Sequence, residues 1–195
     1  RERDWILESE NIDPEDLERE PVCKLCGGSG WRGAAMCECL RELCRQEQKK
    51  VLMQAFGAGK ESFEKFRLDV YPERIAPKLG ISPRALMKRV YESAVSYTKT
   101  FSEGSDSLLF MGATGLGKTF LSGCIARAVA DKGYSVCYVS AGKLFSDFET
   151  EKFRLKEDGA LTGEYMETDL LIIDDLGTEM TTQFTVSALY QVVNG

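Results

Sequence analysis

The chain has 195 residues, of which 43% are hydrophobic, and a net charge of −6, so it can form one full core with a small appendage. No apolar run approaches the roughly 18 residues of a transmembrane helix, and the absence of histidine excludes a histidine-based catalytic triad or metal site. No leader-like apolar segment follows Arg1, so we expect a cytoplasmic protein that does not contact membranes.

The charge changes sign within the first sixty residues. Residues 1–20 carry three basic and nine acidic side chains, which predicts an acidic, solvated N-terminal arm. Residues 21–60 carry seven basic and three acidic side chains. This second segment could contact nucleic acid or an acidic partner, although an ordinary solvated face explains so small an excess more simply.

Five of the seven cysteines lie between positions 23 and 44. Cys23 and Cys26 form a C-x-x-C pair before a Gly-Gly-Ser-Gly turn, and Cys37 and Cys39 follow as a second pair. Two such pairs can place four thiolates around one Zn²⁺, whereas a reducing compartment disfavours disulfides. We predict these four cysteines as ligands of a structural zinc ion, with Cys44 as the alternative to Cys39.

A helix is predicted directly after the cysteines. Residues 40–56 have apolar side chains at helical spacing, so residues 21–58 are predicted as a cysteine-rich zinc-binding segment with its helix. Gly57-Ala58-Gly59 predicts a linker, after which residues 59–195 form the second domain.

Aromatic side chains are frequent in residues 62–72. They could form an apolar wall for a nucleotide base, or pack in the core as most aromatic residues do. Ser82 at the N-cap position and Pro83 at the first helical position then predict a helix that continues to about Phe101.

Residues 112–119 form a complete G-x-x-x-x-G-K-[ST] motif, between an apolar run at 107–111 that predicts a strand and a helical pattern at 120–129. Glycines let backbone N–H groups face phosphate oxygens, Lys118 adds a positive charge, and the Thr119 hydroxyl can ligate Mg²⁺. The alternative is a glycine-rich turn that binds nothing, but such a turn would not need a strand before it and a helix after it. The predicted nucleotide-binding residues are Gly112, Ala113, Thr114, Gly115, Leu116, Gly117, Lys118, Thr119 and Phe120.

Asp169 is followed by the apolar run of residues 170–173, which ends in Asp174 and Asp175, and this is the Walker B pattern. Its composition predicts a strand buried on both faces of a parallel sheet, with the two acids at the edge where ligands bind. We assign Asp174 to Mg²⁺ and Asp175 to the attacking water, with Lys118 as the third catalytic residue. Two acids that merely end a strand are the alternative, which the phosphate loop disfavours.

The segments between and after these motifs alternate in the same way. Residues 135–140 predict a strand, and residues 141–155 and 182–193 predict helices. This alternation indicates an α/β fold with right-handed crossovers and a parallel sheet. Because the Walker B run lies so near Gly195, we expect the sheet to be unfinished, residues 59–195 to be C-terminally incomplete and the chain to be a fragment at both ends.

Several runs are together similar to one family of P-loop ATPases. They are the phosphate-loop run at 109–119, Leu-Leu-Ile-Ile-Asp-Asp-Leu-Gly-Thr-Glu at 170–179, Leu-Tyr-Gln-Val-Val-Asn at 189–194, Phe-Glu-Lys-Phe at 63–66, and Cys-x-x-Cys-Gly-Gly-Ser-Gly from Cys23. The chain resembles the AAA+ ATPases of the DnaC/DnaI helicase-loader and IstB transposition-helper group. The resemblance is good over residues 60–195 and looser in the cysteine segment.

The resemblance implies a three-layer αβα P-loop NTPase that uses ATP and Mg²⁺ to install a replicative helicase on DNA. It also implies an N-terminal grip on the helicase, binding of single-stranded DNA and ATP-dependent homo-oligomers. The sensor asparagine and arginine finger of the family would fall after Gly195. Asp175 stands where many AAA+ proteins have glutamate, which implies slow or switch-like hydrolysis.

Three other functions remain open at this point. An IstB-like protein that assists a transposase would have the same chemistry, and the cysteine segment favours the loader only mildly. A small-molecule P-loop kinase would need an arginine-rich lid, for which residues 152–156 are a thin candidate. An adaptor could bind ATP without hydrolysing it.

Overall fold

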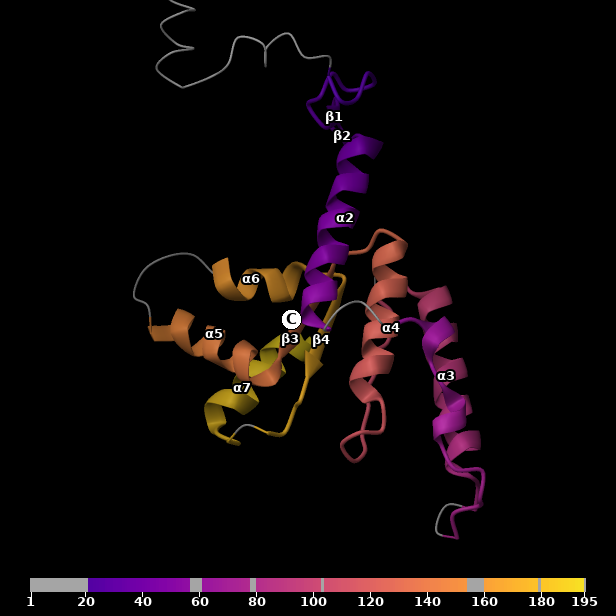
Figure 1. The fold of residues 1–195 in the computed structure, drawn as a ribbon. Helices are drawn as coiled ribbons and strands as arrows, with labels where there is room; N and C mark the ends of the chain where they lie inside the picture. The colour runs from indigo at the N-terminus through magenta and orange to yellow at the C-terminus, as the bar shows by residue number, and fades with distance from the viewer. Residues whose placement is uncertain are drawn as a thin grey trace, which may run out of the picture. The chain divides into compact units, whose positions relative to one another are not determined.

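The computed structural model describes residues 21–56, 61–77, 80–102, 104–153, 160–178 and 180–194. The predicted acidic arm at 1–20 and the predicted linker at Gly57-Ala58-Gly59 lie outside the described residues. The chain divides into two compact units, Arg1–Cys44 and Arg45–Gly195, whose helices and strands are labelled in Figure 1. No described helix is both long and apolar enough to cross a membrane.

The first unit is a small hairpin followed by the start of a helix. Strands β1 (Trp31–Arg32) and β2 (Ala35–Met36) pair antiparallel, and helix α2 (Glu38–Ala55) begins two residues later. Gly30 has a φ of +76°, and a Cβ atom there would lie 2.8 Å from Cδ2 of Leu40. Glycine is therefore required where the chain turns back against α2.

The second unit contains the end of α2 and the remaining elements. These are the 3-10 helices η2 (Phe63–Lys65) and η3 (Leu68–Val70), helices α3 (Pro83–Thr100), α4 (Lys118–Asp131), α5 (Ala141–Phe153), α6 (Ala160–Glu167) and α7 (Gln183–Asn194), and strands β3 (Val136–Ser140) and β4 (Leu170–Asp174). The two strands pair in parallel, from Val136 opposite Leu170 to Ser140 opposite Asp174. The predicted strands around 135–140 and 169–174 are thus confirmed.

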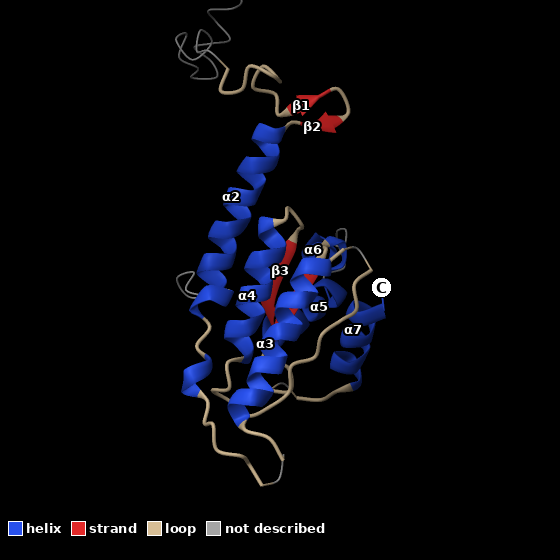
Figure 2. Ribbon diagram, turned by 90° about the vertical axis from the view of Figure 1, so that its right-hand side faces the viewer, coloured by secondary structure: helices blue, strands red, loops and turns tan. Residues whose placement is uncertain are grey.

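Helices cover both faces of this sheet, as the two ribbon views show (Figure 1 and Figure 2). Alternate strand residues point to opposite faces. Val136, Tyr138 and Ile172 join a core formed by α4 and α3, with the end of α2. Val139, Leu171 and Ile173 join a second core formed by α5, α6 and α7. The unit is therefore an α/β fold with a parallel sheet between two helical layers.

The helices predicted from apolar periodicity are also confirmed, as α2, α3, α4, α5 and α7. The side chain of Ser82 accepts a hydrogen bond from the Ala85 N–H at 3.2 Å, as its predicted N-cap role requires. The predicted end of α5 beyond Phe153 lies outside the described residues.

The prediction of a strand at residues 107–111 is wrong. This segment has no strand pairing in the described part of the chain, and Leu109 and Met111 are 71% and 82% exposed. An apolar extended run becomes a strand only where a neighbouring backbone completes its hydrogen bonds. The strand β4 was predicted to be buried on both faces, but every one of its residues is only half-buried. Helix α6 was not predicted.

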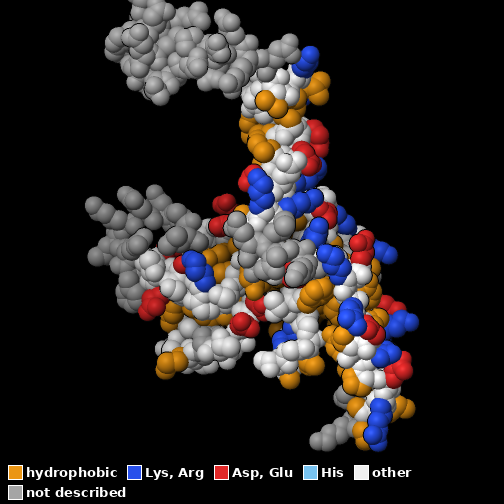
Figure 3. Space-filling view, in the orientation of Figure 1, with side chains coloured by type: hydrophobic (Ala, Val, Ile, Leu, Met, Phe, Trp, Pro, Cys, Tyr) orange, Lys and Arg blue, Asp and Glu red, His pale blue; other side chains and the backbone are white. Residues whose placement is uncertain are grey.

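The surface of the second unit mixes charged and apolar side chains. Lys and Arg are interspersed with Asp and Glu along α3 in the view of Figure 3. On this helix, the charged atoms of Lys88 and Glu92 are 3.9 Å apart. On α7, Val186, Tyr190 and Val193 share one helix face and are 56%, 71% and 62% exposed. The side of the unit drawn in Figure 3 therefore carries no purely basic face along α3.

Asp147 ties α5 to α6. The residue is only 9% exposed, and its carboxylate accepts hydrogen bonds from Lys143 Nζ at 2.6 Å and from the Tyr165 hydroxyl of α6 at 2.5 Å. Burial by itself would raise the pKa of Asp147. The hydrogen bonds from Lys143 and Tyr165 outweigh it and hold this pKa below its ordinary value.

We expect Asp147→Asn to lower the free energy of unfolding at neutral pH by about 1 to 2 kcal/mol, because the charged acceptor is lost. The folded-state pKa lies below the unfolded value of about 3.9, so this contribution is complete above that value and is lost as the pH falls through the folded pKa. Urea unfolding from neutral pH down to about pH 2 measures it. Glu149→Gln, at an exposed position of the same helix, is the control, and a difference independent of pH would contradict the assignment.

Candidate nucleotide and metal sites

The predicted phosphate loop has the backbone that its motif requires. Gly112, Gly115 and Gly117 have φ angles of +148°, +77° and +87°, in the region that residues with a Cβ rarely adopt. Gly117 is the N-cap of α4, which begins at Lys118. The first turn of a helix has N–H groups without internal partners, so the loop and α4 together form an anion site.

Lys118 folds over this loop. Its ammonium donates to the carbonyl oxygens of Gly112 and Ala113, each at 3.0 Å. A phosphate placed against the loop would compete with these carbonyl oxygens for the ammonium protons. Because the phosphate is negatively charged, its hydrogen bond to the ammonium is the stronger one. Thr119 is exposed, whereas the Phe120 ring packs 5.9 Å from that of Phe66. Phe120 can therefore offer a phosphate its backbone N–H but not its side chain.

The loop lies at the end of the sheet where both strands finish. Only a short turn through Gly133, with φ +95°, separates the end of α4 at Asp131 from the start of β3. Because α4 packs along the sheet and its last residue leads through that short turn into β3, its first turn must lie toward the carboxyl ends of the strands. Ligands of open α/β sheets bind at this carboxyl edge.

Asp174 is half-buried, and both of its carboxylate oxygens accept hydrogen bonds. Oδ2 accepts from the Tyr138 hydroxyl at 2.8 Å, and Oδ1 accepts from the Asp175 N–H at 2.9 Å. Each oxygen has a second lone pair, so the carboxylate is oriented and can still bind a cation.

Tyr138 is a site residue that the sequence analysis missed. It lies two residues before Ser140, the partner of Asp174 in the sheet, so both side chains belong to the same face. Its ring packs 4.2 Å from that of Phe56. Burial, and then the hydrogen bond to Asp174, raise the pKa of Tyr138. The hydroxyl therefore stays protonated at neutral pH and can act as the donor.

Asp175 is exposed and takes a left-handed backbone with φ +56°, the only non-glycine residue to do so among those described. The Thr178 hydroxyl donates to its carbonyl oxygen at 2.9 Å. A left-handed non-glycine residue costs roughly 1 kcal/mol or more, and such conformations are frequent at functional sites. The chain thus turns sharply between the two acids.

In the first unit, the four predicted ligands Cys23, Cys26, Cys37 and Cys39 come together, with all their sulfur atoms within 4.8 Å of one another. The Cys23 and Cys37 sulfurs are 3.9 Å apart, and those of Cys26 and Cys39 are 3.5 Å apart. Four sulfurs at 2.3 Å from a tetrahedral Zn²⁺ would lie about 3.8 Å apart. Both of these separations lie close to that spacing, so the cluster is compatible with a zinc site. Cys44 is exposed and does not belong to it.

The surroundings of Cys26 favour a thiolate at this one position of the cluster. Burial opposes ionisation of Cys26, but hydrogen bonds from the Gly30 N–H, at 3.3 Å, and from the Cys39 thiol outweigh it and lower the pKa of Cys26 to about 6. The hydrogen bond with Cys26, and then burial, raise the pKa of Cys39 to about 12. The Cys26 sulfur thus ionises first and accepts a hydrogen bond from the Cys39 thiol, which keeps its proton.

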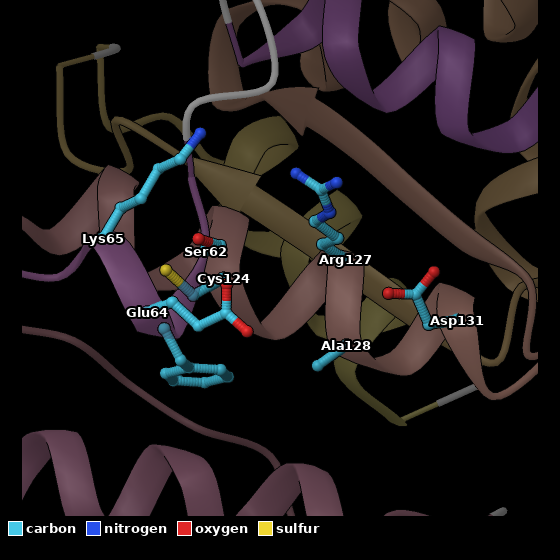
Figure 4. A pocket seen from close by; sticks show the side chains of 8 residues that line it. Ser62, Glu64, Lys65, Cys124, Arg127, Ala128 and Asp131 are labelled. Atoms are coloured by element: carbon cyan, nitrogen blue, oxygen red, sulfur yellow. The ribbon is translucent and has the colours of Figure 1, made fainter.

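A separate hollow of about 400 Å³ lies beside the second half of α4 (Figure 4). Its lining includes Ser62, Lys65, Cys124, Arg127 and Asp131. It contains no predicted site residue and lies away from the phosphate loop at the first turn of the same helix.

A glycine loop that opens a helix beside an acid-ended parallel strand is the site of a P-loop ATP-binding protein. Residues 86–195 match the family model of the IstB-like ATP binding proteins, which covers more than half of the chain and both motifs. The chain belongs to this family of AAA+ ATPases. A search of curated proteins found no match. The cysteine cluster lies outside the matched residues.

Tyr138→Phe removes the donor that orients Asp174 and leaves the ring in place. We expect the Mg²⁺ concentration for half-maximal ATP turnover to rise by roughly 2- to 13-fold, the worth of one hydrogen bond. ATP affinity without Mg²⁺ should not change.

Tyr134→Phe is the matched control, since the Tyr134 ring packs on Phe101 and its hydroxyl bonds to neither Asp174 nor Asp175 in the described structure. An unchanged Mg²⁺ requirement in Tyr138→Phe would contradict the role of Tyr138.

Proposed function

We propose that this protein binds and hydrolyses ATP and couples it to loading a replicative helicase onto DNA. The observation that carries the ATP chemistry is the phosphate loop at the carboxyl edge of the parallel strands, where the hydrogen-bonded carboxylate of Asp174 also lies. Membership of the IstB-like ATP binding family supports it. In this proposal, the protein acts in the cytoplasm.

In this proposal, described residues take the roles of phosphate binding, Mg²⁺ binding and water activation. Backbone N–H groups of residues 112–119 and the ammonium of Lys118 bind the β- and γ-phosphates. The Thr119 hydroxyl and Asp174 hold Mg²⁺, which neutralises charge on the phosphates. Asp175 orients the attacking water and accepts its proton. The shorter side chain of aspartate, compared with glutamate, is consistent with slow hydrolysis.

The separate cysteine unit supports the loader. A four-cysteine cluster without an open ligand position is structural rather than catalytic. We therefore assign it to stabilising the surface of this chain that binds the helicase. ATP-dependent homo-oligomers and contact with single-stranded DNA belong to the same proposal. The alternative is an IstB-like protein that assists a transposase, because the matched residues include the ATP site but not the cysteine unit. Family membership makes a small-molecule kinase the least supported function.

We expect the purified protein to contain one zinc ion per chain, because four thiolates at tetrahedral spacing form a closed site. Cys39→Ser should lose the metal, whereas Cys44→Ser should keep it, since only Cys39 belongs to the cluster. Metal analysis and release of zinc to a chelator measure both. Retention of zinc in Cys39→Ser, or its loss in Cys44→Ser, would contradict this ligand set.

The proposed partner is tested by mixing the protein with ATP and the replicative helicase of the same source and analysing the mixture by size-exclusion chromatography. We expect co-elution that is weakened in Lys118→Ala through lost ATP binding and in Cys39→Ser through a lost partner surface. Asp175→Asn should still bind ATP and form the complex but not turn ATP over. Binding to a transposase in place of the helicase would reject the loader and support the alternative.

A further inference from the structure

A tyrosine from outside the nucleotide motifs bonds to the backbone of the phosphate loop. The Tyr71 hydroxyl donates to the carbonyl oxygen of Leu116 at 2.9 Å, across 45 positions of sequence. The approach is close, since a Cβ atom at Gly117 would lie only 2.9 Å from the Tyr71 oxygen. The contact therefore falls on the peptide that joins Leu116 to Gly117, immediately before the first residue of α4.

Tyr71 is itself held firmly. Arg84, in the first turn of α3, donates from Nε to the Tyr71 carbonyl oxygen at 2.9 Å and from a terminal nitrogen to the Asp69 carbonyl oxygen at 3.1 Å. Arg84 also forms an ion pair with Glu73. The Tyr71 ring stacks on Phe66, with centroids 6.3 Å apart and an angle of 18° between planes. Both the backbone and the ring of Tyr71 are thus fixed.

The peptide geometry gives this contact a consequence for phosphate binding. A trans peptide is planar, so its C=O and N–H groups point in opposite directions. A hydrogen bond that holds the Leu116 oxygen toward Tyr71 therefore turns the Gly117 N–H to the other side of the loop. That N–H makes no hydrogen bond to any described residue, and it belongs to the glycine that precedes Lys118 in the phosphate-binding motif.

We propose that Tyr71 is a positioning residue of the nucleotide site, whose hydroxyl fixes the Leu116–Gly117 peptide so that the Gly117 N–H is presented to a phosphate. The proposal rests on the ATP binding proposed above and adds a requirement outside the Walker motifs. It assigns Tyr71 to the phosphates of the ligand and not to its base. Burial raises the pKa of Tyr71, so the hydroxyl keeps its proton at neutral pH.

The test compares two ligands, ATP and inorganic tripolyphosphate, for binding to the full chain and to Tyr71→Phe by calorimetric titration. Tyr71→Phe keeps the stacked ring and removes only the hydroxyl. We expect both ligands to bind more weakly by a similar factor, roughly 2- to 13-fold, as for the loss of one neutral hydrogen bond. Tyr91→Phe is the matched control, because the Tyr91 hydroxyl donates to the Phe63 carbonyl oxygen at 3.2 Å, outside the loop. It should bind both ligands as the wild type does.

Arg84→Lys provides an independent variant, since lysine cannot reproduce the guanidinium contacts to Tyr71 and Asp69. We expect Arg84→Lys to weaken the binding of both ligands. The double variant with Tyr71→Phe should lose less binding free energy than the sum of the two single losses, because the two residues act on one peptide. Melting temperatures without ligand should be similar for Tyr71→Phe and Tyr91→Phe.

Wild-type affinity for both ligands in Tyr71→Phe would overturn the proposal while leaving ATP binding intact. A loss of affinity for ATP but not for tripolyphosphate would also overturn it, because it would place Tyr71 against the base. Failure of the wild-type chain to bind either ligand would overturn the proposed ATP function as well.

Discussion

The burial of α4 is the constraint on which the rest of the second unit depends. Leu121, Ala126 and Val129 are at most 2% exposed, between α3 on one side and the sheet on the other. Gly123 allows an equally close approach, because a Cβ atom there would lie 2.8 Å from Glu61 and 3.2 Å from Phe56. Packing against α3 and the sheet holds α4 in place and thereby restrains its first turn. The phosphate loop ends at that turn, so the packing of α4 also positions the loop relative to the strands.

Much of this arrangement could be predicted from the sequence, because it is encoded locally. The glycines of the loop, the apolar spacing of α4 and the alternation of strands and helices each occupy a short window. The acid-ended strand and the cysteine pairs are equally local, and the structure brings the four predicted cysteines together. Phosphate binding by the loop and Mg²⁺ binding by Asp174 remain predictions from the motifs.

The rest depends on pairs that are distant in the chain. The contact of Tyr138 with Asp174 follows from the register of β3 against β4, and that of Tyr71 with Leu116 follows from how Arg84 holds the preceding segment. Neither register nor loop path can be predicted from residue spacing. The strand prediction at 107–111 failed for a related reason. An apolar run encodes a tendency to extend, but the neighbour that would complete its hydrogen bonds is not encoded in that run.

The central claim is that the loop of residues 112–119 binds the phosphates of ATP, and an equilibrium titration of Mg²⁺–ATP into the wild-type chain and Lys118→Ala tests it most directly. The account predicts saturable binding at one site per chain in the wild type. It predicts affinity weaker by roughly tenfold or more in Lys118→Ala, which loses a charge-assisted contact to phosphate. Absence of saturable binding, or equal affinity of the two proteins, would contradict it.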